Sequence, residues 1–121
     1  MVAAAAGDAT AVHAQTPEDR ASARALGVEA VHLADSGDCA SAIPKFEAAE
    51  RLYHAPTTLE RLGECRIKVG RLVAGTEDLN RVVREVLPPN APAPFVAAQA
   101  AAAQLLASTA PRIAKLRIHV D

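Results

Sequence analysis

Apolar residues recur at helical spacing along five successive stretches of the chain, and glycines or prolines separate these stretches. In the second stretch, for example, Ala42, Phe46 and Ala49 follow one another at i, i+4 and i+7. The pattern predicts an all-α fold with helices at about 17–35, 41–54, 57–69, 72–87 and 94–109. We therefore expect one helical domain over residues 16–110.

Local signals mark where the first two helices begin. Thr16 before Pro17 is typical of an N-cap followed by the first helical residue, and Gly37 is expected to end this helix. The second helix contains Pro44, which would break a hydrogen bond in a helix interior. We expect Ser41 to be its N-cap, because Pro44 then falls in the first turn, where its missing amide needs no partner.

The third and fourth helices carry similar signals. Thr57 and Glu60 have the spacing of a capping box, and Gly70 is expected to end the third helix. Gly63 lies in the middle of that helix, where glycine is unfavourable. We predict that a neighbouring helix crosses the third helix at this point.

The two ends of the chain differ from the helical region. Residues 1–15 are rich in alanine, and we interpret them as a signal-peptide remnant or a disordered tail. Residues 115–121 alternate between polar and apolar positions, with Leu116, Ile118 and Val120 on one face, which predicts a short strand. An isolated strand is unstable, so we expect 111–121 to lead into a β domain or to pair with another molecule. The alternative is an extended, frayed tail.

Composition narrows the classes of function. Aromatic residues make up only 2% of the 121 residues, which predicts a thin core built from small side chains. A net charge of −1 argues against binding of nucleic acid, and no apolar run is long enough to span a membrane.

The histidine, glutamate and cysteine residues do not form a recognisable catalytic or metal-binding motif. The four histidines are His13, His32, His54 and His119, and no two have the i, i+4 spacing of a zinc site. Glu47 and Glu50 are expected to lie on a solvated helix face. We favour Cys39 and Cys65 as two small hydrophobic residues, although a disulfide between their antiparallel helices is geometrically conceivable. We expect no cofactor, no metal and no catalytic activity.

The helical pattern repeats after about 33 residues and resembles the tetratricopeptide repeat. The first unit, 23–56, matches at Leu26, Ala30, Leu33, Gly37, Ala42, Phe46 and Ala49; the second, 56–89, at Leu59, Leu62, Gly63, Gly70 and Leu79. The resemblance implies two antiparallel helix-turn-helix repeats, which the fifth helix would cap. The order of elements is also similar to that of exported bacterial repeat proteins that continue into a PEGA-type β domain.

This resemblance implies a non-catalytic protein-interaction module that binds a peptide or partner protein in a groove. By analogy, the first helix of each unit would line that groove, with Arg24, Gly27, Val31, Ala34 and Asp35 in the first unit and Thr57, Glu60, Glu64, Ile67 and Lys68 in the second. The lysine and asparagine set that clamps peptide carboxylates in some relatives is missing. Glu60 and Glu64 suggest a basic or mixed peptide, unless they are ordinary solvated charges.

Two further expectations concern assembly and location. The alternative function is a structural protein that self-associates weakly through its helical ends or its C-terminal strand. The N-terminal pattern and the resemblance favour a periplasmic or cell-envelope protein, and the alternative location is the cytoplasm.

Overall fold

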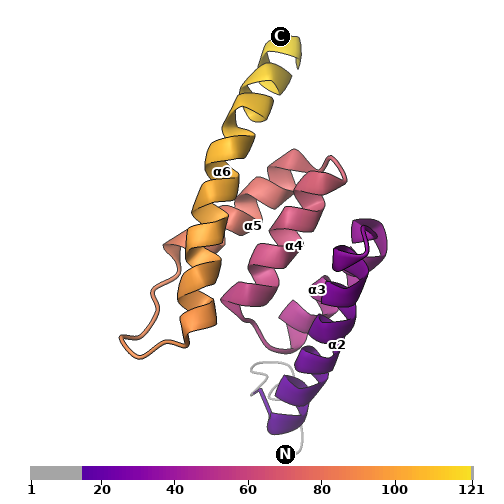
Figure 1. Cartoon of the computed structure of the whole chain (residues 1–121), viewed down its shortest axis with the longest axis vertical. Coiled ribbons are helices and arrows are strands. Elements are labelled where there is room, and N and C mark those ends of the chain that lie inside the picture. Colours follow the sequence, from indigo (N-terminus) through magenta and orange to yellow (C-terminus); the bar gives the residue numbers. More distant parts are fainter. Residues whose placement is uncertain (1–14, 121) are drawn as a thin grey trace, which may run out of the picture.

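The computed structural model describes residues 15–120, with side chains up to Lys115, and Figure 1 shows that they form an all-helical fold. The helices are α2 (Pro17–Asp35), α3 (Cys39–Leu52), α4 (Pro56–Lys68), α5 (Leu72–Arg84) and α6 (Ala93–Val120). Helix α2 packs against α3, and α4 packs against α5, so that the chain forms two helical hairpins. Helix α3 also packs against α4, and α6 covers α4 and α5. The predicted all-α fold with two helix-turn-helix repeats and a covering helix is confirmed.

The two hairpins are closed by turns of the same geometry. Gly37 and Gly70 lie 33 residues apart and have φ angles of 88° and 91°, in the left-handed region that glycine tolerates best. In each turn, the amide after the glycine donates to the carbonyl oxygen five residues earlier, at 2.8 Å. This is the bond that closes a Schellman-type helix end. The repetition seen in the sequence is therefore present in the backbone.

Small side chains allow the helices to approach closely. Ala30, Ala42 and Ala102 are fully buried, and the largest buried side chains are few: Phe46, Leu79, Val82, Pro56 and Cys65. Gly63 lies where α5 crosses α4, because a Cβ atom there would be 2.9 Å from Cδ2 of Leu79. The predicted helix crossing at Gly63 is therefore confirmed.

The start of α2 is as predicted, but the start of α3 is not. Thr16 caps α2 in a capping box with Asp19. The N-cap of α3 is Asp38, whose carboxylate accepts from the Ser41 amide at 3.1 Å, so the helix begins before the expected cap at Ser41. Pro44 consequently lies inside α3 rather than in its first turn, and the helix continues through it.

The start of α4 also differs from the expected capping box. Its N-cap is Ala55, which has no side chain that can cap the helix, and Thr57 already lies within it. The Ala55 amide instead donates to the Glu50 carboxylate at 3.0 Å, a contact supplied by the preceding helix. Glu60 is thereby free of a capping role.

A disulfide joins the beginning of α3 to the end of α4. Cys39 and Cys65 are bonded to each other, and both are buried, with 6% and 1% of their surfaces exposed. The favoured interpretation of two unpaired small hydrophobic residues was wrong, and the alternative holds. The bond ties the two hairpins together at a place where α3 and α4 already pack.

The predicted C-terminal strand is also wrong. Helix α6 begins at Ala93, as expected for the covering helix, but it passes through Pro111 and continues to Val120. Figure 1 shows its C-terminal part extending beyond the other helices. Within residues 15–120 no strand offers a partner, and extending an existing helix adds a hydrogen bond for each residue fixed. The predictions for residues 1–14 and Asp121 lie outside the described residues.

Candidate functional site

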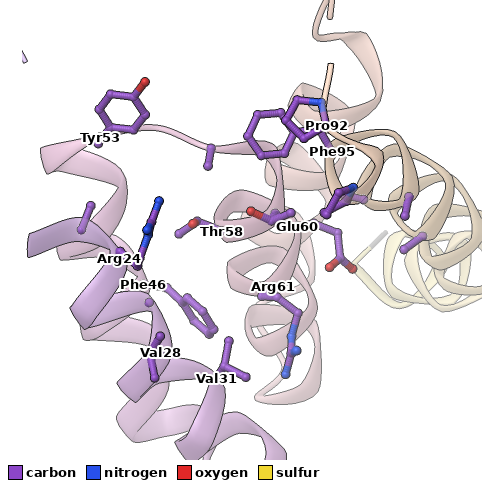
Figure 2. Close-up of a pocket in the computed structure, with 18 of the residues that line it drawn as sticks. Arg24, Val28, Val31, Phe46, Tyr53, Thr58, Glu60, Arg61, Pro92 and Phe95 are labelled. Atoms are coloured by element: carbon purple, nitrogen blue, oxygen red, sulfur yellow. The ribbon is translucent and has the colours of Figure 1, made fainter. Parts of the chain in front are cut away.

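An open groove of about 1070 Å³ lies between α2, the segment before α4, α4 itself and the first turns of α6. Figure 2 shows Tyr53 and Phe95 on opposite sides of this groove, with Thr58 and Glu60 between them. The groove exists because α2 and α6 both pack on the central helices but are not packed against each other. The site is therefore a product of helices that are distant in the sequence.

Helical periodicity explains which side chains reach the groove. On α2 they recur three or four residues apart and therefore share one face: Arg20, Arg24, Val28 and Val31. On α4, Thr57, Glu60 and Arg61 have the same relationship. These faces belong to the first helix of each hairpin.

The lining is mainly apolar and includes every aromatic residue of the chain. The sequence contains two phenylalanines, one tyrosine and no tryptophan, and Phe46, Tyr53 and Phe95 all line the groove. Phe46 is 1% exposed and contributes to the core, whereas Tyr53 and Phe95 are partly exposed. Val28, on α2, is 55% exposed.

Glu60 is the one acidic side chain in this lining, and it is 7% exposed. Burial raises the pKa of the Glu60 carboxyl to about 7, and the negative charge of Glu64 raises it further, while Arg61 opposes the shift. Among the described residues, no hydrogen bond or ion pair reaches this carboxylate. The groove thus contains a buried acid with no partner of its own.

The neighbouring Arg61 is held by other carboxylates. Its guanidinium donates to Asp35 at 2.7 Å and lies 3.3 Å from Glu64. Figure 2 shows that Arg61 and Glu60 leave α4 in different directions. Arg61 therefore links α2 to α4 and leaves Glu60 unpaired.

The two arginines of α2 lie at the edge of the groove. Arg20 stacks over the Tyr53 ring, 4.7 Å from its centroid, while Arg24 is exposed and forms no ion pair with the described residues. Thr57 and Thr58 add hydroxyl groups to the lining. The groove therefore combines apolar walls, a cationic edge and a buried acid.

The structure brings together some of the predicted groove residues but not all of them. Arg24, Val31 and Glu60 line the groove, as do Gly27 and Thr57. The others lie elsewhere: Asp35 and Glu64 are paired with Arg61, Lys68 is exposed beside Glu64, and Ala34 and Ile67 are buried in the core. Ile67 packs against α5, because a Cβ atom at Gly75 would be 2.7 Å from its Cγ1.

A second, smaller hollow of about 470 Å³ lies over α3, α4 and α5, and several of its charged groups are paired. Arg66 donates to Glu47 at 2.6 Å and to Asp78 at 2.8 Å. His54 lies 2.7 Å from both Glu50 and Glu85. The hydrogen bond to Glu50 is the main reason why the pKa of His54 is raised to about 9, and Glu85 adds to it. These contacts connect α3, α4 and α5 with one another.

Over the described part of the chain, no three His, Cys, Asp or Glu side chains are grouped so that they could hold a metal ion. Within residues 15–120, no helix combines the length and apolar character that crossing a membrane requires. No protein-family model, curated protein or solved structure matches this chain. The resemblance to tetratricopeptide repeats therefore stays a prediction, and the function is inferred from the groove.

Proposed function

We propose that this chain is a non-catalytic protein-interaction module that binds an extended peptide, or a segment of a partner protein, in the groove. The observation that carries the proposal is the placement of Tyr53 and Phe95, the two partly exposed aromatic residues of the chain, along one open groove whose lining also includes the buried Phe46. Tyrosine and phenylalanine are enriched at protein interfaces, where they bury a large area with few rotatable bonds.

The size and the polar groups of the groove favour a peptide. Small-molecule pockets enclose roughly 300–1,000 Å³, and this groove, at about 1070 Å³, is open along one side. Arg24, Thr57 and Thr58 present donors and hydroxyl groups that can bind the peptide backbone. Val28 and Phe95 offer apolar contacts to alternate side chains of an extended segment.

The repeat architecture supports the same proposal. The two hairpins have turns of one geometry 33 residues apart, and α2 and α4, the first helix of each hairpin, line the groove. This is the arrangement that the resemblance to tetratricopeptide repeats implies. We therefore propose that the chain is a tetratricopeptide-like module.

We also propose that the protein works in an oxidising compartment, such as the periplasm or cell envelope. The Cys39–Cys65 disulfide supports this location, because disulfides persist there and are rare in a reducing cytoplasm. Trapping of free thiols in intact cells with an alkylating reagent tests the proposal. Two alkylated cysteines in the freshly trapped protein would instead favour the cytoplasm.

Peptide selection tests the proposed function. Peptides from a random phage-displayed library are selected on the immobilised chain, and their dissociation constants are measured for the wild type, Ala97→Arg and Ala103→Arg. Both alanines are exposed on α6, but only Ala97 lines the groove. We expect Ala97→Arg to weaken binding at least about tenfold and Ala103→Arg to leave it unchanged. Equal affinities for all three proteins, or no selected peptide, would contradict the proposal.

Self-assembly is the alternative function, but the structure does not support association through a C-terminal strand. Residues 111–120 are helical, so they offer no strand edge for pairing with another chain. Association through the helical ends stays a prediction, and one candidate is the C-terminal part of α6, which extends beyond the other helices in Figure 1. Sedimentation of the full chain and of a chain ending at Ala110 would give equal monomer masses if this route does not operate.

A further inference from the structure

We infer that the groove selects a partner segment that carries a basic side chain, and that this side chain forms an ion pair with Glu60. The inference rests on the proposed function, because it names the chemistry of the segment that the groove would bind. Its starting point is Glu60, a groove residue that is 7% exposed and whose carboxylate has no hydrogen-bond or ion-pair partner among the described residues.

No cation among residues 15–115 is bonded to Glu60. Arg61 is bound to Asp35 at 2.7 Å and lies 3.3 Å from Glu64. Arg20 stacks on Tyr53. A buried carboxylate without a partner is costly, so a cation supplied by a ligand gains more at this position than at a solvated one.

An acidic partner segment that pairs with Arg24 is the alternative, and the structure favours it less. Arg24 is exposed, and an ion pair between solvated groups contributes little because water already stabilises both charges. Glu60 is largely buried, so water hydrates its carboxylate only in part, and pairing this carboxylate with a cation gains more than pairing a fully solvated group. The buried acid therefore determines the preference of the groove, and the exposed arginine does not.

The shape of a basic side chain also fits the groove. Lysine and arginine have long apolar stems that pack along hydrophobic surface while the charged end reaches a polar group. Phe95, Ala98 and Ala101 of α6 line the groove together with Glu60. Figure 2 shows the Glu60 side chain reaching into the space beside α6. A stem lying on these apolar residues would carry its cation to the carboxylate.

Binding of a cation at Glu60 should be coupled to loss of a proton. Burial raises the pKa of this carboxyl to about 7, so part of the free protein is protonated at neutral pH. The charges that act on Glu60 are those of Glu64 and Arg61 on α4. The other charged or titratable groups among the described residues of the groove lining are Arg20, Arg24 and His32 on α2 and Tyr53 before α4, while the groove residues of α6 are uncharged. Affinity for a basic segment should therefore rise from about pH 6 to about pH 8, as Glu60 ionises.

Capped peptides with a single varied position test the inference. The central residue is lysine, norleucine or glutamate, and the flanking residues are drawn from valine, leucine and alanine. Norleucine keeps the apolar stem of lysine and removes its charge. Binding is measured at about pH 6 and about pH 8 for the wild type, Glu60→Gln and the control Glu64→Gln, which removes an acid from the same helix but outside the groove lining.

We expect the wild type to prefer lysine to norleucine by about tenfold at the higher pH, and to lose most of this preference at the lower pH. Glu60→Gln should bind both peptides equally at either pH. Glu64→Gln leaves Glu60 in place, so it should keep the preference for lysine, but the preference should appear at a lower pH because Glu64 raises the pKa of Glu60. Equal binding of lysine and norleucine by the wild type, or a preference for glutamate, would overturn this inference and leave the proposed function standing. Absence of binding to every peptide would overturn both.

Discussion

Gly63 and Gly75 are in direct contact where α4 crosses α5. A Cβ atom at Gly75 would lie 2.8 Å from the carbonyl oxygen of Gly63 and 2.7 Å from Cγ1 of Ile67. The positions 33 residues earlier are Ala30 and Ala42, and both are fully buried. The first hairpin thus has methyl groups at positions where the second has only hydrogen atoms.

The first prediction is that Gly75→Ala destabilises the protein. A methyl group at Gly75 must push against the backbone of α4, which gives way less easily than a flexible side chain. We expect a loss of about 2 kcal/mol in the free energy of unfolding, even though alanine is the better helix former. Gly27→Ala is the matched control, because nothing lies within 4 Å of a Cβ atom there, and it should stabilise α2 by up to about 1 kcal/mol. Urea unfolding of the oxidised proteins measures both, and a stable Gly75→Ala variant would contradict the close contact.

Most of the fold could be predicted because its signals are local. Gly37 and Gly70 mark turns that need a positive φ angle, and Thr16 caps α2 through its own side chain. The beginning of α4 could not be predicted in this way, since the Ala55 amide is satisfied by Glu50 from the preceding helix. The prediction of a strand after Pro111 was wrong for a related reason. Alternating polar and apolar residues form a strand only when a sheet is available for pairing.

The candidate site could be predicted only in part. The resemblance to tetratricopeptide repeats predicted Arg24, Val31 and Glu60 correctly, but it also predicted residues that lie outside the groove. It could not identify Phe95, since the approach of α6 to the groove depends on tertiary packing. One sequence feature was informative but was not used: in a chain with so few aromatic residues, each of them is a candidate for the site.

The second prediction concerns the stability cost of Glu60. Its folded-state pKa of about 7 is raised above the ordinary glutamate value, so the folded state binds more protons than the unfolded state between these values. The free energy of unfolding should therefore fall as the pH rises from about 4.5 to about 7. Above this range, the contribution of Glu60 should no longer change with pH. Glu60→Gln should be more stable than the wild type by about 3 kcal/mol above pH 7 and equal to it near pH 4. Denaturant unfolding across this range would contradict the assignment if the two curves stayed parallel.

The third prediction is that the Cys39–Cys65 disulfide contributes substantially to stability. It closes a loop with a sequence separation of 26 residues, and a cross-link of this length is worth about 3 kcal/mol through restriction of the unfolded chain. A Cys39→Ala/Cys65→Ala double variant should lose about this much, and a reductant should then have no further effect. Free-thiol titration of the denatured, unreduced wild type provides the check on the bond itself, which two reactive thiols would rule out.

The last prediction is that His54 links α3 to the segment after α5 through its charged form. Its ring nitrogens lie 2.7 Å from Glu50 and 2.7 Å from Glu85, and the hydrogen bond to Glu50 is the main cause of a pKa of about 9. A histidine pKa that is raised on folding contributes stability that is fully present below about pH 6.5 and is lost as the pH rises through about 9. The His54 side chain is 39% exposed, so solvent screening reduces the contribution to about 1 kcal/mol. His54→Gln should remove this pH-dependent loss of stability while sparing the other groups that titrate at high pH. Proton NMR titration of the His54 ring measures the pKa directly, and a midpoint near 6.5 would show that the two carboxylates do not hold the charged form.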